Sequence, residues 1–315
     1  MSKKAKRPAL VRPQSRGFQR FAPGRPWTVS AWLRGYVAIP DPIELVPGWT
    51  LIPDGPGSRE SVVVSPPVPH AKVTGAVAQA PEFRLTGKVV ARTRSAARDA
   101  GLATAHHAIN LAALQLEVLF EDILDVQVLG PGEDVAPGVT RHPMEHVMHV
   151  SATATRPLSG DVVSPAYATW QRWESLAPSR QVVVVRAADW WRRALLVGKV
   201  DPPSGLLCAW AALEALASLA DTAPSRSQHC PACQAPLVCG HCNTEIVIPG
   251  ADLRRLLTET WGTLGRDDFR NTRDLRNYLI HGGTPPVPLS ELATHATRMT
   301  ALLLTAVRKV LLAEM

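Results

Sequence analysis

Two basic side chains stand five positions apart near the end of the stretch RNYLIHGG, residues 276–283. Arginine presents a rigid fork of N–H donors that matches two oxygens of a phosphate group. Histidine is the residue type whose ordinary pKa lets it take up and release a proton near neutral pH. Arg276 and His281 are therefore suited to chemistry on a phosphate ester, and Asn277 adds a hydrogen-bonding group beside Arg276.

The same residues also have a purely structural explanation. Cationic side chains are favoured in the last turn of a helix because its dipole is negative there, and glycine commonly ends a helix. On an ideal helix, positions five apart point about 140° away from each other. Arg276 and His281 therefore do not form a single-face pair. Unwinding at Gly282 and Gly283, or a second copy of the chain, is needed to bring them together.

Four cysteines are concentrated in HCPACQAPLVCGHC, residues 229–242. Cys230 and Cys233 form one C-x-x-C pair, and Cys239 and Cys242 form a second. Two intervening residues allow a tight turn that directs both sulfurs at one metal, and four thiolates complete the tetrahedral coordination of Zn²⁺. The spacer between the pairs is shorter than in ordinary zinc ribbons. We therefore expect a compact knuckle with a closed, structural zinc site.

Other uses of these cysteines stay open. Two disulfides would account for all four, although a reducing cytoplasm disfavours them. Unligated thiols and an iron–sulfur cluster are further alternatives, and no neighbouring feature indicates redox chemistry. His229 and His241 could each replace a cysteine as a ligand. Cys208 lies alone in an apolar segment and is typical of a small buried side chain.

The elements that position these residues are predicted to be helices. From about residue 164, apolar side chains recur at helical spacing. The segment that carries Glu214 has Ser204 as its expected N-cap, and the segment that carries Arg276 ends at two glycines. The cysteine cluster interrupts the helical region once. Helices are expected over residues 179–199, 202–221, 251–264, 267–281 and 289–314.

The first half of the chain has a different pattern. Alternating or β-branched segments predict strands, and one long Ala- and Leu-rich segment predicts a helix with Ser95 as its N-cap. Strands are expected over residues 27–39, 61–65, 86–93, 124–130 and 145–155, and the helix over 95–120. Strands around one helix indicate an α+β domain over residues 27–160. Its sequence contains no repeat and no catalytic signature, so its role is left open.

Basic charge is concentrated at the N-terminus. The 315-residue chain has a formal net charge of +7, yet residues 1–26 contain eight lysines and arginines and no acid. Four prolines in this segment exclude a regular helix. We expect a disordered arm, which is either only solvated or attracts a polyanion such as RNA.

No segment of the sequence indicates contact with a membrane. The longest nearly apolar run, residues 206–220, is shorter than the ~20 residues that a membrane span needs and contains Glu214. An N-terminal apolar signal region is also missing. We therefore expect a cytoplasmic protein that does not enter a membrane.

The arginine–histidine element resembles the motif of the HEPN superfamily, whose helical bundles carry an Arg and a His four to six residues apart. In RNYLIHG the matching residues are Arg276 and His281, with Asn277 at a position that is often polar. The chain is most similar to the Apea-like HEPN branch, in which a helix similar to LLCAWAALEALA, with acidic Glu214, precedes the motif helix. The resemblance covers residues 175–314, and the cysteine cluster is an insertion between the helices of this region.

The predicted fold is thus an α+β N-terminal domain, which the resemblance does not cover, followed by an all-α HEPN-like helical bundle over residues 164–314 with a zinc-knuckle insertion at residues 229–242. The resemblance itself implies the fold and activity of the bundle. Active members of the family are metal-independent endoribonucleases that work as dimers. By this resemblance Arg276, Asn277, His281 and Glu214 are the catalytic set. His281 would transfer a proton and Arg276 would stabilise phosphorane charge. Asn277 would orient one of them, and Glu214 would either tether a basic group or be an ordinary surface residue.

Three hypotheses of different class follow. The first is a ribonuclease that acts on RNA as a homodimer, serving as a toxin or an anti-phage defence effector with a trigger or antitoxin partner. The second is a non-catalytic HEPN module that binds RNA or scaffolds an assembly. The third is a zinc-stabilised interaction protein with no role in nucleic-acid binding. The complete Arg-Asn and His pattern favours the first over the second, and the basic arm favours both over the third.

Overall fold

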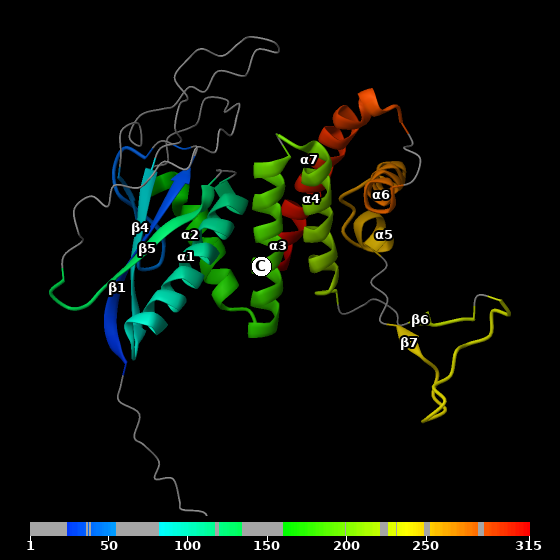
Figure 1. The fold of residues 1–315 in the computed structure, drawn as a ribbon, viewed down its shortest axis with the longest axis horizontal. Coiled ribbons are helices and arrows are strands. Elements are labelled where there is room, and N and C mark those ends of the chain that lie inside the picture. Colours follow the sequence, from blue (N-terminus) through cyan, green and yellow to red (C-terminus); the bar gives the residue numbers. More distant parts are fainter. Residues whose placement is uncertain are drawn as a thin grey trace, which may run out of the picture.

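The computed structural model combines a sheet, a group of helices and a small hairpin (Figure 1). It describes residues 24–35, 37, 39–54, 82–116, 120–133, 160–198, 200–220, 226–230, 232–248, 253–282 and 287–315. The strands expected over 61–65 and 145–155, and the basic arm up to residue 23, lie outside these ranges. The first strand begins at Arg25, inside the range expected for the arm.

The sheet has five antiparallel strands in the order β2-β3-β4-β1-β5. The strands are β1 Arg25–Gly35, β2 Ile43–Val46, β3 Trp49–Pro53, β4 Glu82–Ala91 and β5 Phe120–Leu129. β1 is paired along both edges and is buried along most of its length, as expected for an inner strand. The polar side chain of Ser30 on this strand is satisfied by Thr86 on β4, with their hydroxyl oxygens 3.0 Å apart.

Helix α1, Arg94–Leu116, covers the sheet, and Val29 of β1 packs against its backbone at Gly101. The predicted N-cap at Ser95 is wrong. Thr93 holds that place, because its Oγ1 accepts a hydrogen bond from the N–H of Ala96 at 3.1 Å. Both hydroxyl side chains are good caps, so composition alone does not choose between them. The helix also ends earlier than expected, and Phe120 begins β5 instead.

The second half of the described chain is helical, apart from the hairpin, which runs from β6 to β7 and contains the four clustered cysteines. Its elements are α2 Gly160–Glu174, α3 Pro178–Val197, α4 Pro202–Ala217, β6 Arg226–Ser227, β7 Val247–Ile248, α5 Leu253–Arg255, the π-helical turn η1 Leu256–Thr260, α6 Arg266–His281 and α7 Leu289–Glu314. α3, α6 and α7 lie within two residues of their expected bounds. An antiparallel sheet followed by helices confirms the α+β class with a helical C-terminal part.

Two helical predictions need correction. Ser204 is not the N-cap of α4, because the carboxylate of Asp201 accepts the N–H of Ser204 at 3.5 Å. The two prolines after Asp201 favour a helical first turn, so the helix starts before Ser204. The helix expected over residues 251–264 is broken into a short α-helical turn and η1, which ends where Gly262 adopts a positive φ of 58°.

The sheet and the helices share one continuous set of buried apolar side chains. In Figure 1, α1 and α2 lie beside the sheet, and α3, α4 and α7 follow, with α5 and α6 beyond them. α3 and α4 pack closely, and Gly205 of α4 meets the backbone of Gly198 so tightly that a Cβ would not fit. None of the helices in the described ranges has an apolar stretch long enough to cross a bilayer.

A buried arginine joins the sheet to the helices. The side chain of Arg192 on α3 is 1% exposed. Its Nε donates to Asn110 Oδ1 of α1 at 2.8 Å, and its Nη1 donates to the carbonyl of Phe120 at 3.1 Å. Its Nη2 donates to Asp122 Oδ1 of β5 at 2.6 Å. Burial alone would raise the pKa of Asp122, but the hydrogen bond and charge of Arg192 outweigh it, and the pKa is lowered.

We predict that Arg192→Ala lowers the free energy of unfolding by about 3–5 kcal/mol, because it leaves the buried Asn110 oxygen and the Phe120 carbonyl without their donor. Arg193→Ala is the matched control. Its side chain is 53% exposed, pairs with Asp189 one turn back and lies over the ring of Trp190, so its loss should cost less than about 1 kcal/mol. Urea unfolding followed by circular dichroism measures both. Equal midpoints for the two variants would contradict a structural role for Arg192.

Candidate functional site

Helix α4 supplies an anchored carboxylate. Trp210 and Glu214 are four positions apart and so lie on one face of the helix. The indole Nε1 of Trp210 donates to Glu214 Oε1 at 2.8 Å. The Trp210 ring is buried against Phe269 of α6, with ring centroids 5.8 Å apart, whereas the Glu214 side chain is 51% exposed. A buried ring therefore holds a half-exposed carboxylate at the edge of the α4–α6 contact.

Helix α6 brings Arg276 to that carboxylate. The Nη2 of Arg276 donates to Glu214 Oε1 at 3.0 Å, and its Nη1 donates to Asn277 Oδ1 at 3.2 Å. The guanidinium carbon lies 5.9 Å from the centroid of the Trp210 ring, within the range of a cation–π contact. The structure thus brings together three of the predicted site residues, Glu214, Arg276 and Asn277.

The guanidinium of Arg276 is only partly satisfied. Two of its five N–H donors are used by Glu214 and Asn277. Its Nε is buried and has no hydrogen-bond partner in the part of the chain that the structure describes. The side chain is 25% exposed, so a ligand can approach it. Arg276 is therefore a fixed positive charge that keeps donors for a further partner.

His281 is the last residue of α6 and is exposed. Residues of the described ranges form no hydrogen bond or ion pair with its side chain. Gly282 ends the helix with a φ of 63°, and its N–H donates to the carbonyl of Tyr278 at 2.9 Å. Because α6 stays regular through His281, the angle of about 140° between positions 276 and 281 is kept. The two basic side chains thus leave α6 on different sides.

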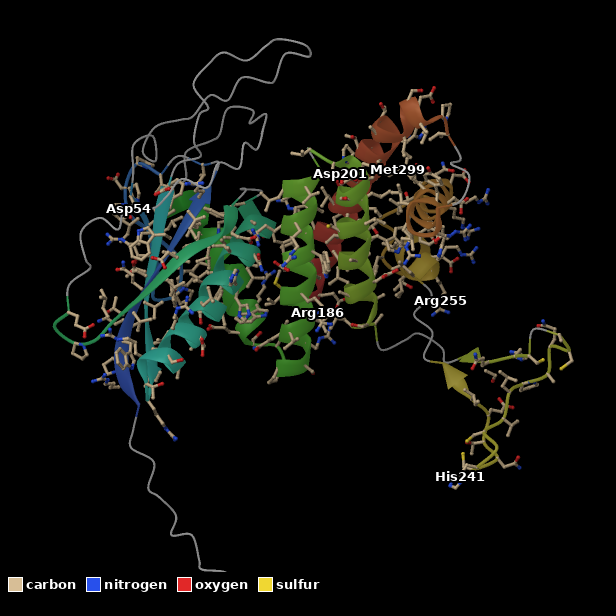
Figure 2. The ribbon with its side chains drawn as sticks, viewed as in Figure 1. Asp54, Arg186, Asp201, His241, Arg255 and Met299 are labelled. Carbon is tan, nitrogen blue, oxygen red and sulfur yellow. The ribbon has the colours of Figure 1, made fainter. Side chains whose placement is uncertain are left out.

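A cavity of about 230 Å³ lies between α6 and the first half of α7. Its lining residues are Asn271, Asp274, Leu275, Val287, His295, Arg298 and Met299, and Figure 2 labels Met299. Asp274 precedes His281 by seven positions, so the two lie within about 20° of the same side of α6 and about 10 Å apart along its axis. The cavity is therefore lined by both apolar and polar side chains, and one of its lining residues, Asp274, lies on the side of α6 that carries His281.

The two cysteine pairs form in the hairpin, away from this site (Figure 1). Cys230 and Cys239 are half-buried, and Cys233 and Cys242 are exposed. Hydrogen bonds from the N–H groups of Cys233 and Ala232 lower the pKa of the Cys230 thiol. Lower pKa values favour the thiolate, which is the form that binds metals.

The second pair has a similar environment. The hydroxyl of Thr244, with Oγ1 2.8 Å from Cys242 Sγ, is the main cause of a lowered pKa for the Cys242 thiol. Among the described residues, however, no three His, Cys, Asp or Glu side chains gather closely enough to hold a metal ion. The two cysteines of each C-x-x-C pair thus lie on one turn, and the two pairs do not come together into one metal site in the described conformation.

Sequence reasoning missed Trp210 and the cavity. The signal for Trp210 was available, because a glutamate one turn after a tryptophan on a strongly apolar helix needs a polar partner. The cavity had no such signal, since His295 and Arg298 reach it from α7 only after α6 and α7 have packed.

Comparisons of the chain with known protein families, with curated proteins and with solved structures find no match.

We predict a measurable coupling between Glu214 and Arg276. A double-mutant cycle with Glu214→Ala, Arg276→Ala and the double variant should give about 1 kcal/mol, because Arg276 is mostly shielded from water. The control cycle is the exposed pair Arg273–Asp274, whose coupling should be near zero. Both are measured by urea unfolding. Additive effects in the first cycle would mean that Glu214 does not hold Arg276.

Proposed function

We propose that this chain is a metal-independent endoribonuclease of HEPN type, acting in the cytoplasm as a toxin or an anti-phage defence effector. The observation that carries the proposal is the setting of Arg276. Its guanidinium is fixed by Glu214 and Asn277, keeps donors for another ligand and lies on the helix that ends with an exposed His281. Preorganised donors of this kind stabilise charge that develops in a transition state.

The proposed reaction uses the RNA's own 2′-hydroxyl as nucleophile. The 2′-oxygen attacks the adjacent phosphorus and loses its proton to a base, the bond from phosphorus to the 5′-oxygen breaks, and an acid protonates that oxygen. His281 transfers protons, since imidazole suits both roles near neutral pH. Arg276 binds the phosphate oxygens and stabilises the phosphorane. The products carry 2′,3′-cyclic phosphate and 5′-hydroxyl ends, and no metal takes part.

A homodimer would complete the site. Arg276 and His281 leave one helix on different sides, so a two-fold axis beside α6 would bring the arginine of one copy near the histidine of the other. Two exposed apolar side chains support this position for the contact: Ile280 next to His281, and Leu289 at the start of α7.

The surface of α6 supports RNA as the substrate. Arg270, Arg273 and His281 lie along one exposed side of the helix, with Asn277 between them at intervals of three or four residues. Such a row can follow a chain of phosphates. The cavity beside Asp274 would accept a base turned out of the strand, because its polar lining side chains can form hydrogen bonds with the edges of an unstacked base.

A second hypothesis is a non-catalytic HEPN module that binds RNA or scaffolds an assembly. The observation that favours it is the lack of any described side chain that orients His281, which catalytic histidines commonly have. In this case Arg276 would serve mainly to hold α6 on α4. The two hypotheses differ in one result: the non-catalytic module would bind RNA without cutting it.

The test of catalysis incubates the full chain with RNA in EDTA. His281→Ala should lower the cleavage rate by about 10²–10⁴-fold and Arg276→Ala by about 10²–10³-fold. Arg186→Ala, an exposed arginine on α3 (Figure 2), and His241→Ala in the hairpin are the matched controls and should keep the wild-type rate. End-group analysis should find cyclic phosphates, and a 2′-deoxy residue at the cut position should prevent cleavage. Full activity of His281→Ala, or 5′-phosphate ends, would refute the mechanism.

The test of the shared site mixes two inactive variants. If each site takes its arginine from one copy and its histidine from the other, a heterodimer of Arg276→Ala and His281→Ala contains one complete site. Mixing should therefore restore up to a quarter of the wild-type rate, whereas each variant alone stays inactive. Light scattering should give twice the chain mass. A dimer that regains no activity on mixing, or an active monomer, would show that both groups act within one chain.

A further inference from the structure

The cysteine hairpin is built from two copies of a nine-residue unit. The first cysteines of the two pairs, Cys230 and Cys239, are nine positions apart, and so are the second cysteines, Cys233 and Cys242. In both copies the N–H of the first cysteine donates to the carbonyl five residues further on, at 2.8 Å. The two pairs therefore sit on turns of the same construction.

The two turns also share an uncommon backbone conformation, a positive φ at a residue other than glycine. Gln234 and Asn243, each directly after a second cysteine, have φ values of 59° and 55°. Their N–H groups donate back to the carbonyls of the first cysteines, at 2.8 and 2.9 Å. A left-handed glutamine is uncommon without a reason. Here it closes the turn, so that both sulfurs of a pair lie on one small loop.

Three residues, again nine positions apart, tie the two turns to one point. The N–H of Gln228 donates to Ile246 at 2.8 Å, that of Ile246 to Leu237 at 2.8 Å, and that of Leu237 to Gln228 at 2.6 Å. Each N–H donates to the backbone carbonyl of the named residue, so the three hydrogen bonds form a closed cycle. This cycle lies between β6 and β7 on one side and the two turns on the other. Both cysteine turns thus branch from a single junction.

The described residues of this unit form no apolar core. Among its described residues from 227 to 246, none is buried, and the apolar side chains of Val238 and Ile246 are exposed. So small a unit cannot be held by hydrophobic burial and needs a cross-link or a metal. A disulfide within a C-x-x-C pair would close one turn on itself and would leave the two turns unconnected.

We propose that the hairpin is a zinc-binding unit whose two turns close on one metal ion. Four thiolates, from Cys230, Cys233, Cys239 and Cys242, match the tetrahedral preference of Zn²⁺ and leave no position for a substrate. Since the described conformation keeps the two pairs apart, binding draws the turns together about the junction. The metal would supply the stability that the missing core does not. This inference is independent of the ribonuclease proposal.

The experiment titrates the reduced, metal-free full chain with Co²⁺ and follows its visible spectrum. A thiolate site should give the intense bands of tetrahedral cobalt and a thiolate-to-cobalt charge-transfer band, with an end point of one Co²⁺ per chain. Added Zn²⁺ should abolish the bands by displacement. Two Co²⁺ per chain would mean that each turn binds its own ion. One Co²⁺ per two chains would mean a bridge between copies. Either result, or no bands, overturns the proposal.

Variants and proteolysis complete the test. Cys233→Ser and Cys242→Ser should each reduce Co²⁺ affinity by at least tenfold, although they lie on different turns. Cys208→Ser, outside the hairpin, and His241→Ala should leave the titration unchanged. Zn²⁺ should slow proteolytic cutting within the hairpin at least tenfold in wild type and have no effect in Cys242→Ser. Unchanged cutting in wild type would contradict closure, and a loss of bands in His241→Ala would contradict a site of four thiolates.

Discussion

The buried guanidinium of Arg192 is the contact on which the placement of the site depends. It satisfies groups on α1 and β5 from a position on α3, so it fixes that helix against the sheet. α3 in turn packs along α4, where Gly198 and Gly205 allow close approach. α4 carries Trp210 and Glu214, and these hold the arginine of α6. The position of the candidate site is therefore set stepwise from the sheet outward.

Arg192 and Arg276 show two uses of one side chain. Both are forks with five donors, and both are held by a carboxylate and an asparagine oxygen. Arg192 is fully buried and also satisfies a backbone carbonyl, so it has little left to offer a ligand. Arg276 is one-quarter exposed, and the hydrogen bonds to Glu214 and Asn277 use only two of its five donors. Incomplete satisfaction at an accessible position is what distinguishes a candidate binding group from a structural one.

The sequence predicts local features of this protein better than its long-range contacts. α6 and α7 follow from apolar periodicity and from glycine and proline punctuation, which act over a few residues. The caps at Thr93 and Asp201 were missed because neighbouring residues compete for that place. The pair of Glu214 and Arg276 spans sixty-two positions, so only packing decides whether it forms. The hypothesis that Glu214 tethers a basic group did not say which one, and periodicity could not distinguish it from a surface glutamate. In the structure its partner is Arg276.

The separation of the hairpin from α6 bears on how a metal and metal-free catalysis can coexist in one chain. A closed Cys₄ site has no open position for water or phosphate, and the hairpin lies apart from the helices that carry the site (Figure 1). Zinc could then affect cleavage only through the fold of the hairpin or through a partner bound there. The proposed chemistry needs a proton shuttle and a fixed cation, and Arg276 already provides the cation. In these two proposals zinc and Arg276 have separate tasks: the metal would supply the stability of the hairpin, and the guanidinium would take the place of a catalytic metal.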